Sequence, residues 1–191
     1  MPSFLIDVPQ YNTPDAKAYV TEQLKELIAM LEDTFHQKFQ EEELVPILQR
    51  ENASKACYER CLKNLRTHHY PSTLTMQMYM LFASHMNIGT PEILHFYQQM
   101  EAETAAAPEF HGTNILWVHL LPYYQETLKE YFNLTDDYQI QAIEMNLDYR
   151  APLDTEHPLE ALADKMIHNV YNGPYERKAA LVSELAQDLQ S

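Results

Sequence analysis

Two hydrophobic patterns divide this sequence near residue 113, and the change between them limits the folds that the chain can adopt. Upstream, apolar residues recur at spacings of three and four, which is typical of amphipathic helices. Downstream, short β-branched and aromatic runs alternate with helical segments, which is typical of a parallel sheet with right-handed helical crossovers. We therefore expect a helix-rich α/β chain, with an extended lead-in and a helical lobe over 1–112 and a partial α/β lobe over 113–191.

Local start signals predict four helices in the first lobe. Thr13-Pro14 and Thr90-Pro91 each combine a capping residue with a proline at the first helical position. The first signal predicts a long helix reaching Phe35, and the second predicts a helix reaching about Ala107. A further helix should open near Glu42 or Glu43, because Pro46 is tolerated only in a first turn. The segment 74–86 is apolar nearly all round and ends before Gly89, which predicts a helix buried on several sides.

The second lobe contains two predicted strands, ILWVHLL over 115–121 and YQIQAIE over 138–144. Helices are expected over 122–132, 158–170 and 175–190. A parallel sheet of only two strands leaves both at an edge, and such layers normally have more members. We therefore expect this chain to be a piece of a longer polypeptide.

Composition excludes several classes of function. Asp and Glu number 28 against 13 Lys and Arg, a net charge of −15 that repels phosphate backbones, so we expect no nucleic-acid partner. The sequence has only 3 glycines, and they do not form a Gly-rich phosphate-binding loop. No apolar run approaches the length of a membrane span, and 2 cysteines do not form a disulfide framework. We expect a soluble, cytoplasmic protein with no membrane partner.

Cys57 and Cys61 share one helical face, and His68 falls on nearly the same stripe. Three such side chains are weak candidates for metal ligands, but no fourth ligand is evident. The favoured interpretation is that the cysteines are buried core residues. The segment from His68 to Pro71 is interpreted as a helix cap whose imidazoles meet the last carbonyl groups.

The ends of the two predicted strands hold the best candidates for a binding site, because ligands of open α/β sheets bind at the carboxyl ends of strands. His119 and Tyr123 follow the first strand, and Glu144 and Asn146 follow the second. We expect these side chains to converge at one edge. The alternatives are that His119 is a core residue and that Asn146 and Asp148 only form a turn. Catalytic roles cannot be assigned from this spacing.

Three segments, LTMQMYMLFASHMNIGTPEIL (74–94), ILWVHLLPYYQETLKEYFN (115–133) and the long stretch over 145–189, give the sequence a family resemblance. The chain resembles the 2-hydroxyacyl-CoA dehydratase and benzoyl-CoA reductase family. It is most similar to the dehydratase-like segment at the carboxyl end of fused CoA-substrate-specific enzyme activases. The resemblance covers nearly the whole chain but contains no short invariant motif.

The resemblance implies a cytosolic, anaerobic system in which an ATP-dependent activator passes one electron to a dehydratase acting on an acyl-CoA. It also implies Rossmann-like lobes joined by a helical region, so that 113–191 would be a truncated Rossmann-like lobe. Members hold a four-iron, four-sulfur cluster through cysteines, one of which follows the second strand of this lobe. Here 144–149 contains no cysteine, so no cluster ligand can be transferred to this chain, although the parent protein could hold a cluster.

These expectations lead to one functional interpretation and one alternative. The chain is interpreted as a fragment of a dehydratase-like protein that contributes to acyl-CoA or partner binding and is not catalytic alone. Its partners would be the remaining lobes of the parent, the activator or a dehydratase subunit, and an acyl-CoA. The alternative is a non-catalytic interaction module that docks the activator or a dehydratase subunit.

Overall fold

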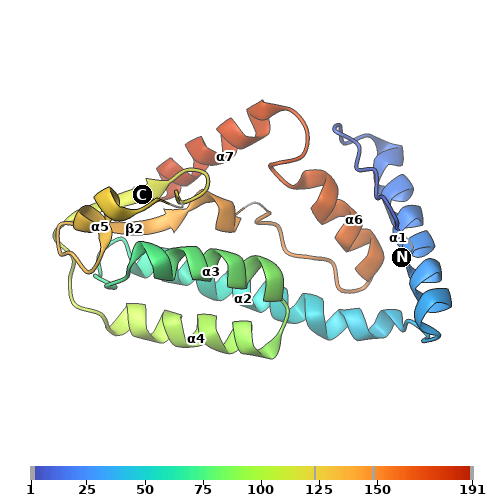
Figure 1. Cartoon of the computed structure of the whole chain (residues 1–191), viewed down its shortest axis with the longest axis horizontal. Helices are drawn as coiled ribbons and strands as arrows, with labels where there is room; N and C mark the ends of the chain where they lie inside the picture. Colours follow the sequence, from blue (N-terminus) through green and yellow to red (C-terminus); the bar gives the residue numbers. More distant parts are fainter. Residues whose placement is uncertain (1–2, 123, 148, 190–191) are drawn as a thin grey trace. The chain divides into compact units, whose positions relative to one another are not determined.

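A computed structural model describes residues 3–122, 124–147 and 149–189. Within these ranges the chain folds into seven α-helices and two strands, in the order α1 (Pro14–Phe35), α2 (Leu44–Asn64), α3 (Leu74–Asn87), α4 (Pro91–Ala106), β1 (Thr113–Trp117), α5 (Glu126–Phe132), β2 (Tyr138–Ile143), α6 (Pro158–His168) and α7 (Tyr175–Asp188). Short 3-10 turns, η1 (Glu41–Glu43) and η2 (Glu144–Leu147), precede α2 and follow β2. The helix-rich α/β class is therefore confirmed (Figure 1).

The chain divides into two compact units. Unit 1 comprises 1–49 and 149–180, and unit 2 comprises 50–148 and 181–191. These are not the ranges that the change of sequence pattern suggested, 1–112 and 113–191. Whether each of those ranges is a domain stays a prediction.

Unit 1 is built on the packing of α1 against α6. Ala16 and Val20 of α1 meet Ala163 and Ile167 of α6, and all four are at most 3% exposed. The two alanines allow the helices to approach closely, and burial of the aliphatic side chains stabilises the pair. A second cluster, formed by Leu48, Tyr149, Leu153 and Ala161, lies in the same unit.

The lead-in is extended, as predicted, and it is held by α1. Ile6 and Val8 pack against the cluster between α1 and α6. The side chain of Gln23 accepts a hydrogen bond from the backbone N–H of Asp7 at 2.7 Å and donates one to its carbonyl at 2.9 Å. One amide side chain thereby satisfies both backbone groups of a segment that has no strand partner.

Unit 2 contains a parallel sheet of β1 and β2, as predicted. Ile115 pairs with Ile140 and Trp117 pairs with Ile143, so β2 has one extra residue between these pairs. Because this bulge shifts the alternation of side chains by one, Ile140 and Ile143 point to the same face despite their odd spacing. They form a core with Leu74 and Leu121, against which Met78, Trp117, Leu128, Phe132 and Met145 also pack.

The strand predicted over 115–121 is shorter than expected, because β1 ends at Trp117. His119 adopts a left-handed backbone conformation with φ of 73°, which a continuing strand does not allow. The indole Nε1 of Trp117 donates to the carbonyl oxygen of Leu120 at 3.2 Å and closes the turn. The predicted helix over 122–132 likewise begins later, at Glu126.

The expectation that the helix over 74–86 is buried on several sides is wrong, because one face of α3 is exposed. Leu74, Gln77, Leu81 and Ser84 are buried, but Met76, Tyr79, Phe82 and Met86 are 49–79% exposed. Within unit 2, α3 lies beside α4 (Figure 1). It also contacts the core of the sheet through Leu74 and Met78. The sequence shows that this helix is apolar, but not that one apolar face has no cover within unit 2.

Candidate functional site

The carboxyl ends of β1 and β2 are joined by a buried carboxylate. Glu144, the first residue after β2, is fully buried, and its Oε2 accepts a hydrogen bond from the backbone N–H of His119 at 3.0 Å. A carboxylate that accepts a backbone N–H stabilises the loop it holds. The site residues His119 and Glu144 are therefore brought together, through the backbone of His119.

The side chain of Asn146 forms hydrogen bonds with two helices of unit 2, α2 and α3. Its Oδ1 accepts a hydrogen bond from the Ser84 hydroxyl of α3 at 3.1 Å, and its Nδ2 donates to the Tyr58 hydroxyl of α2 at 3.5 Å. Tyr58 is itself buried, and this burial raises the pKa of its hydroxyl. Asn146 thus connects the turn after β2 to α2 and α3.

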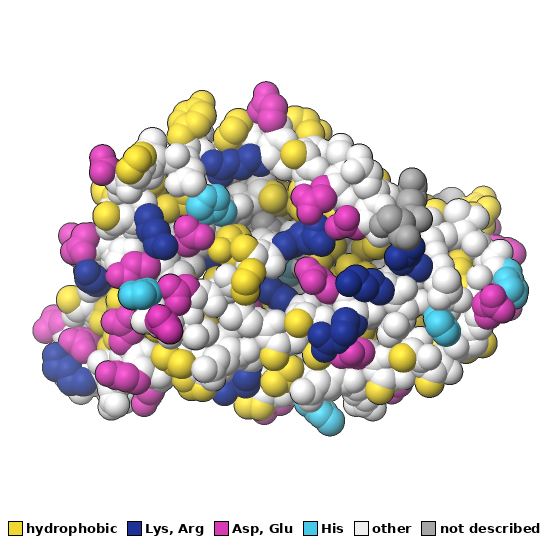
Figure 2. All heavy atoms as spheres, turned by 180° about the vertical axis from the view of Figure 1, so that it is seen from behind, with side chains coloured by type: hydrophobic (Ala, Val, Ile, Leu, Met, Phe, Trp, Pro, Cys, Tyr) yellow, Lys and Arg dark blue, Asp and Glu magenta, His cyan; other side chains and the backbone are white. Residues whose placement is uncertain are grey.

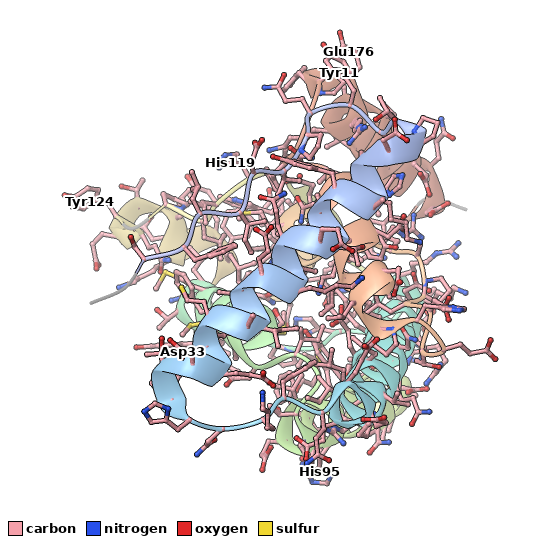
Figure 3. All side chains as sticks on the ribbon, turned by 90° about the vertical axis from the view of Figure 1, so that its right-hand side faces the viewer. Tyr11, Asp33, His95, His119, Tyr124 and Glu176 are labelled. Carbon is pink, nitrogen blue, oxygen red and sulfur yellow. The ribbon has the colours of Figure 1, made fainter. Side chains whose placement is uncertain are left out.

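The loop after β1 lies at the surface. His119 is exposed, and Tyr124, which is 89% exposed, extends away from the ribbon in Figure 3. Tyr123 and Asp148 lie outside the described residues. Of the four predicted site residues, His119 is therefore the one that the structure describes as open to a ligand, while Glu144 is enclosed. The assignment of all four to a binding site stays a prediction.

Cys57 and Cys61 lie in the interior of unit 2, as their favoured interpretation expects. They are 5% and 0% exposed, and both thiols are free. Burial raises the pKa of the Cys57 thiol, and it raises the pKa of Cys61 to about 11. Both thiols are protonated at neutral pH, whereas a metal ligand is a thiolate.

His68 caps α2 as predicted, and each of the last four carbonyl groups of this helix accepts a hydrogen bond. The four last carbonyl groups of a helix have no intrahelical partner. Here the carbonyl of Asn64 meets the backbone N–H and the ring Nδ1 of His68, each at 3.0 Å, and that of Leu62 accepts from the side chain of Gln141 at 2.9 Å. The carbonyls of Cys61 and Lys63 accept the backbone N–H groups of the two residues that follow the helix.

His69 does not share this role. Its backbone N–H donates to the carbonyl of Pro108 at 2.8 Å, and its ring stacks on Phe110 with centroids 5.1 Å apart. Nδ1 of His69 lies 3.3 Å from a carboxylate oxygen of Asp136. The expectation that both imidazoles meet the end of α2 is therefore wrong for His69.

A polar chain that the sequence analysis missed lies in unit 1. The Tyr149 hydroxyl donates to Oδ2 of Asp164 at 3.1 Å, and Oδ1 of Asp164 lies 3.3 Å from Nδ1 of His168. Nε2 of His168 lies 2.6 Å from the side-chain amide of Asn12. These residues are separated by up to 156 positions, so no local pattern could reveal them.

A pocket of about 380 Å³ lies between α3 and α4, and the sequence analysis missed it as well. Methionine and aromatic side chains form most of its wall, among them Met76, Met80, Phe96, Tyr97 and Met100. Ser84, which holds Asn146, is also part of the wall. The signal in the sequence is the dense run of methionines in α3, whose interpretation from the sequence is core or lobe interface.

No metal-binding cluster is present in the part of the chain that the structure describes. Within it, no three His, Cys, Asp or Glu side chains are arranged to hold a metal ion. Carboxylates appear in several separate places on the face seen in Figure 2.

The family model for 2-hydroxyglutaryl-CoA dehydratase, D-component, matches residues 1–191. The chain belongs to this family. The suspected dehydratase relationship is confirmed, and the description as a component places family members in an enzyme system with other subunits. No curated protein and no solved structure matches the chain.

The residues of this dehydratase-family chain do not fit a cysteine-ligated iron–sulfur cluster. Such clusters are held by thiolates, and the turn after β2 contains Glu144 and Asn146 but no cysteine. Cys57 and Cys61 lie on α2 and are kept as thiols by burial.

Among the described residues, no helix combines the length and the apolar composition that crossing a bilayer requires.

Proposed function

We propose that this dehydratase-family chain contributes to binding an acyl-CoA or a partner subunit in an ATP-dependent activase and dehydratase system, as a piece of a longer polypeptide that is not catalytic alone. The family match over residues 1–191 is the observation that carries this proposal. The proposed system is anaerobic and cytoplasmic, and any iron–sulfur cluster belongs to the rest of the parent protein.

The two-stranded sheet supports the assignment as a piece of a larger protein. In the described residues β1 and β2 pair only with each other, so each strand presents one unpaired edge. Open strand edges are sites where further strands add, and β1 is the more open strand here because its residues are half-buried or exposed, whereas five of the six residues of β2 are buried. The remaining lobes of the parent would supply those strands.

The carboxyl ends of the strands support a binding role. The buried Glu144 fixes the backbone of His119 and leaves this exposed residue at the edge where ligands of α/β sheets bind. Glu144 acts here as a positioning residue, and His119 and Tyr123 are the proposed contacts of the ligand. Asn146 supports the same turn through Ser84 and Tyr58.

Calorimetric titration of the purified chain with 2-hydroxyglutaryl-CoA tests the acyl-CoA role. We expect saturable binding that is weakened about tenfold by His119→Ala, which corresponds to about 1.4 kcal/mol. His95→Ala is the matched control, because His95 is also an exposed histidine of unit 2, on α4 (Figure 3). Equal binding by both variants would contradict the proposed site.

The alternative function is a non-catalytic interaction module. The observation that favours it is the pair of buried thiols, because this chain offers no available cluster ligand. If the chain binds no acyl-CoA but forms a stable complex with the activator in gel filtration, the interaction module is the correct assignment.

A further inference from the structure

The outer face of α3 and the neighbouring pocket share Met76 and Tyr79, so together they form one continuous apolar surface in unit 2. Met76, Tyr79, Phe82 and Met86 are 52%, 67%, 49% and 79% exposed. Their spacings of three and four residues place them on one stripe along three turns of the helix. Phe96 of α4 is 42% exposed and also forms part of the pocket wall. We call these five side chains and the pocket the α3–α4 groove.

The pocket within the groove has the size and lining of an anchor site. An apolar cavity of about 150 Å³ accepts one benzene molecule, so the 380 Å³ here is enough for a bulky side chain such as tryptophan or leucine. Met76, Met80 and Met100 line it, and flexible thioether side chains adapt to the shape of an inserted group. Contiguous exposed apolar surface of this kind marks an interaction site.

The charged residues of α3 and α4 indicate which kind of partner fits the groove. Helix α3 contains no Asp, Glu, Lys or Arg, and α4 contains Glu92, Glu101 and Glu103 but no Lys or Arg. Glu101 is paired with Arg60 through two hydrogen bonds. The other two carboxylates have no cationic partner among the described residues; Glu103 accepts hydrogen bonds from the Tyr70 hydroxyl and the Gln99 side-chain amide, both neutral groups. The two carboxylates disfavour phosphate groups, whether of a CoA or of a lipid surface.

These two carboxylates stand near opposite ends of the groove. Glu92, in the first turn of α4, lines the pocket directly. Glu103 accepts the hydroxyl of Tyr70, another lining residue, at 2.8 Å. The two glutamates are eleven positions apart on α4, which is about 16 Å at 1.5 Å per residue. A partner helix lying along the groove would match them with cationic side chains about three turns apart.

We propose that the α3–α4 groove binds a basic amphipathic helix of a partner protein. One bulky apolar side chain of that helix fills the pocket, and its neighbours on the same face cover the stripe of α3. Lys or Arg side chains at the two ends of this face pair with Glu92 and Glu103. Helices bind apolar grooves in this way through anchors at spacings of three and four residues. The inference stands whether or not the strand ends bind an acyl-CoA.

The test uses a fluorescein-labelled helical peptide of about 18 residues, with leucines and one central tryptophan on one face and lysines at both ends of that face. Its binding to the full chain is followed by fluorescence anisotropy. A second peptide keeps the apolar pattern but replaces every lysine by glutamate. We expect the lysine peptide to bind at least about tenfold more tightly, with an advantage that shrinks as salt rises.

Variants of the chain locate the binding surface. Phe96→Ala and Tyr79→Ala should each weaken binding of the lysine peptide about tenfold, since each removes an exposed aromatic contact. Glu92→Gln and Glu103→Gln should each weaken it about threefold and reduce its salt dependence. The matched controls are Tyr175→Ala, whose tyrosine is 77% exposed on α7, and Glu126→Gln, whose side chain is 89% exposed on α5. Neither control should change the affinity.

Three results would overturn the inference. Equal loss of binding in the groove variants and the controls would mean general attraction to an acidic chain. Equal affinity for both peptides would show that the groove does not select a basic partner helix. Self-association of the chain in sedimentation experiments that Phe96→Ala abolishes would show that the groove is covered by a second copy instead.

Discussion

Replacing Gln139 by leucine should destabilise unit 2 by about 2–4 kcal/mol, because one buried amide connects three parts of this unit. Gln139 is 6% exposed. Its Nε2 donates to the carbonyl oxygens of Leu65 at 2.7 Å and His68 at 3.0 Å and to Oδ1 of Asn114 at 2.8 Å. Its Oε1 accepts the backbone N–H of Tyr70 at 3.2 Å.

The magnitude follows from what the variant leaves behind. An NH₂ group has two hydrogens, so its three acceptors share them, and the amide makes about three full hydrogen bonds. Each contributes about 0.5–1.5 kcal/mol, and a buried group left without a partner costs about 1–3 kcal/mol. Leucine has a similar size, so little of the loss comes from a cavity. The range of 2–4 kcal/mol assumes that water reaches some of the abandoned groups.

Urea unfolding monitored by tryptophan fluorescence measures this loss. Trp117, the only tryptophan of the chain, packs against the core of unit 2. The centroid of its ring lies 5.8 Å from that of the Phe132 ring. The matched control is Gln98→Leu on the exposed side of α4, which should change the free energy of unfolding by less than about 0.5 kcal/mol. A change of the same size in both variants would refute the role assigned to Gln139.

Three further predictions concern the core, the thiols and a surface pair. Leu74→Ala, in the fully buried position of the sheet core, should cost about 2–5 kcal/mol in urea unfolding, and a smaller loss would contradict its packing. Cys57 and Cys61 should not react with a disulfide reagent at pH 7.5 until the chain is unfolded, and rapid reaction of the native chain would contradict their burial. The hydrogen bond that the His157 ring donates to the Asp154 carboxylate raises the pKa of His157 and lowers the pKa of Asp154. The pair therefore stabilises the fold between the two titrations, losing effect as pH rises through the raised histidine pKa or falls through the lowered aspartate pKa. In NMR titration His157 should show a pKa above the ordinary histidine value of about 6.5, and Asp154→Asn should lower it; an unchanged pKa in that variant would contradict the pairing.

Local capping chemistry predicted most of the helix boundaries. Helix α1 begins at Pro14 and α4 at Pro91, where the paired signals place them. The hydroxyl of Thr90 accepts the N–H of Ile93 at 3.3 Å, whereas Thr13 makes no such side-chain bond. Gly89, with φ of 91°, follows the end of α3. These signals are reliable because each involves residues within one turn of the boundary.

The candidate site was predicted less completely. The strand ends were correctly recognised as adjacent, since β1 and β2 pair in parallel. The separate environments of His119 and Glu144 were not predicted, because the contact between them spans 25 positions and depends on where β1 ends. The α3–α4 groove was missed because an apolar helix has the same composition whether its outer face is covered or exposed.

The sequence by itself determined the type and the order of the elements, since hydrophobic period and capping residues act over a few neighbouring positions. It also determined the acidic charge and the family. Only the tertiary structure decided that two glutamines of β2 bond to the end of α2, that Glu144 is enclosed, and that one face of α3 is open within unit 2. The physical reason is that burial and hydrogen bonding depend on partners distant in sequence, and Gln139 meets Leu65 across 74 positions.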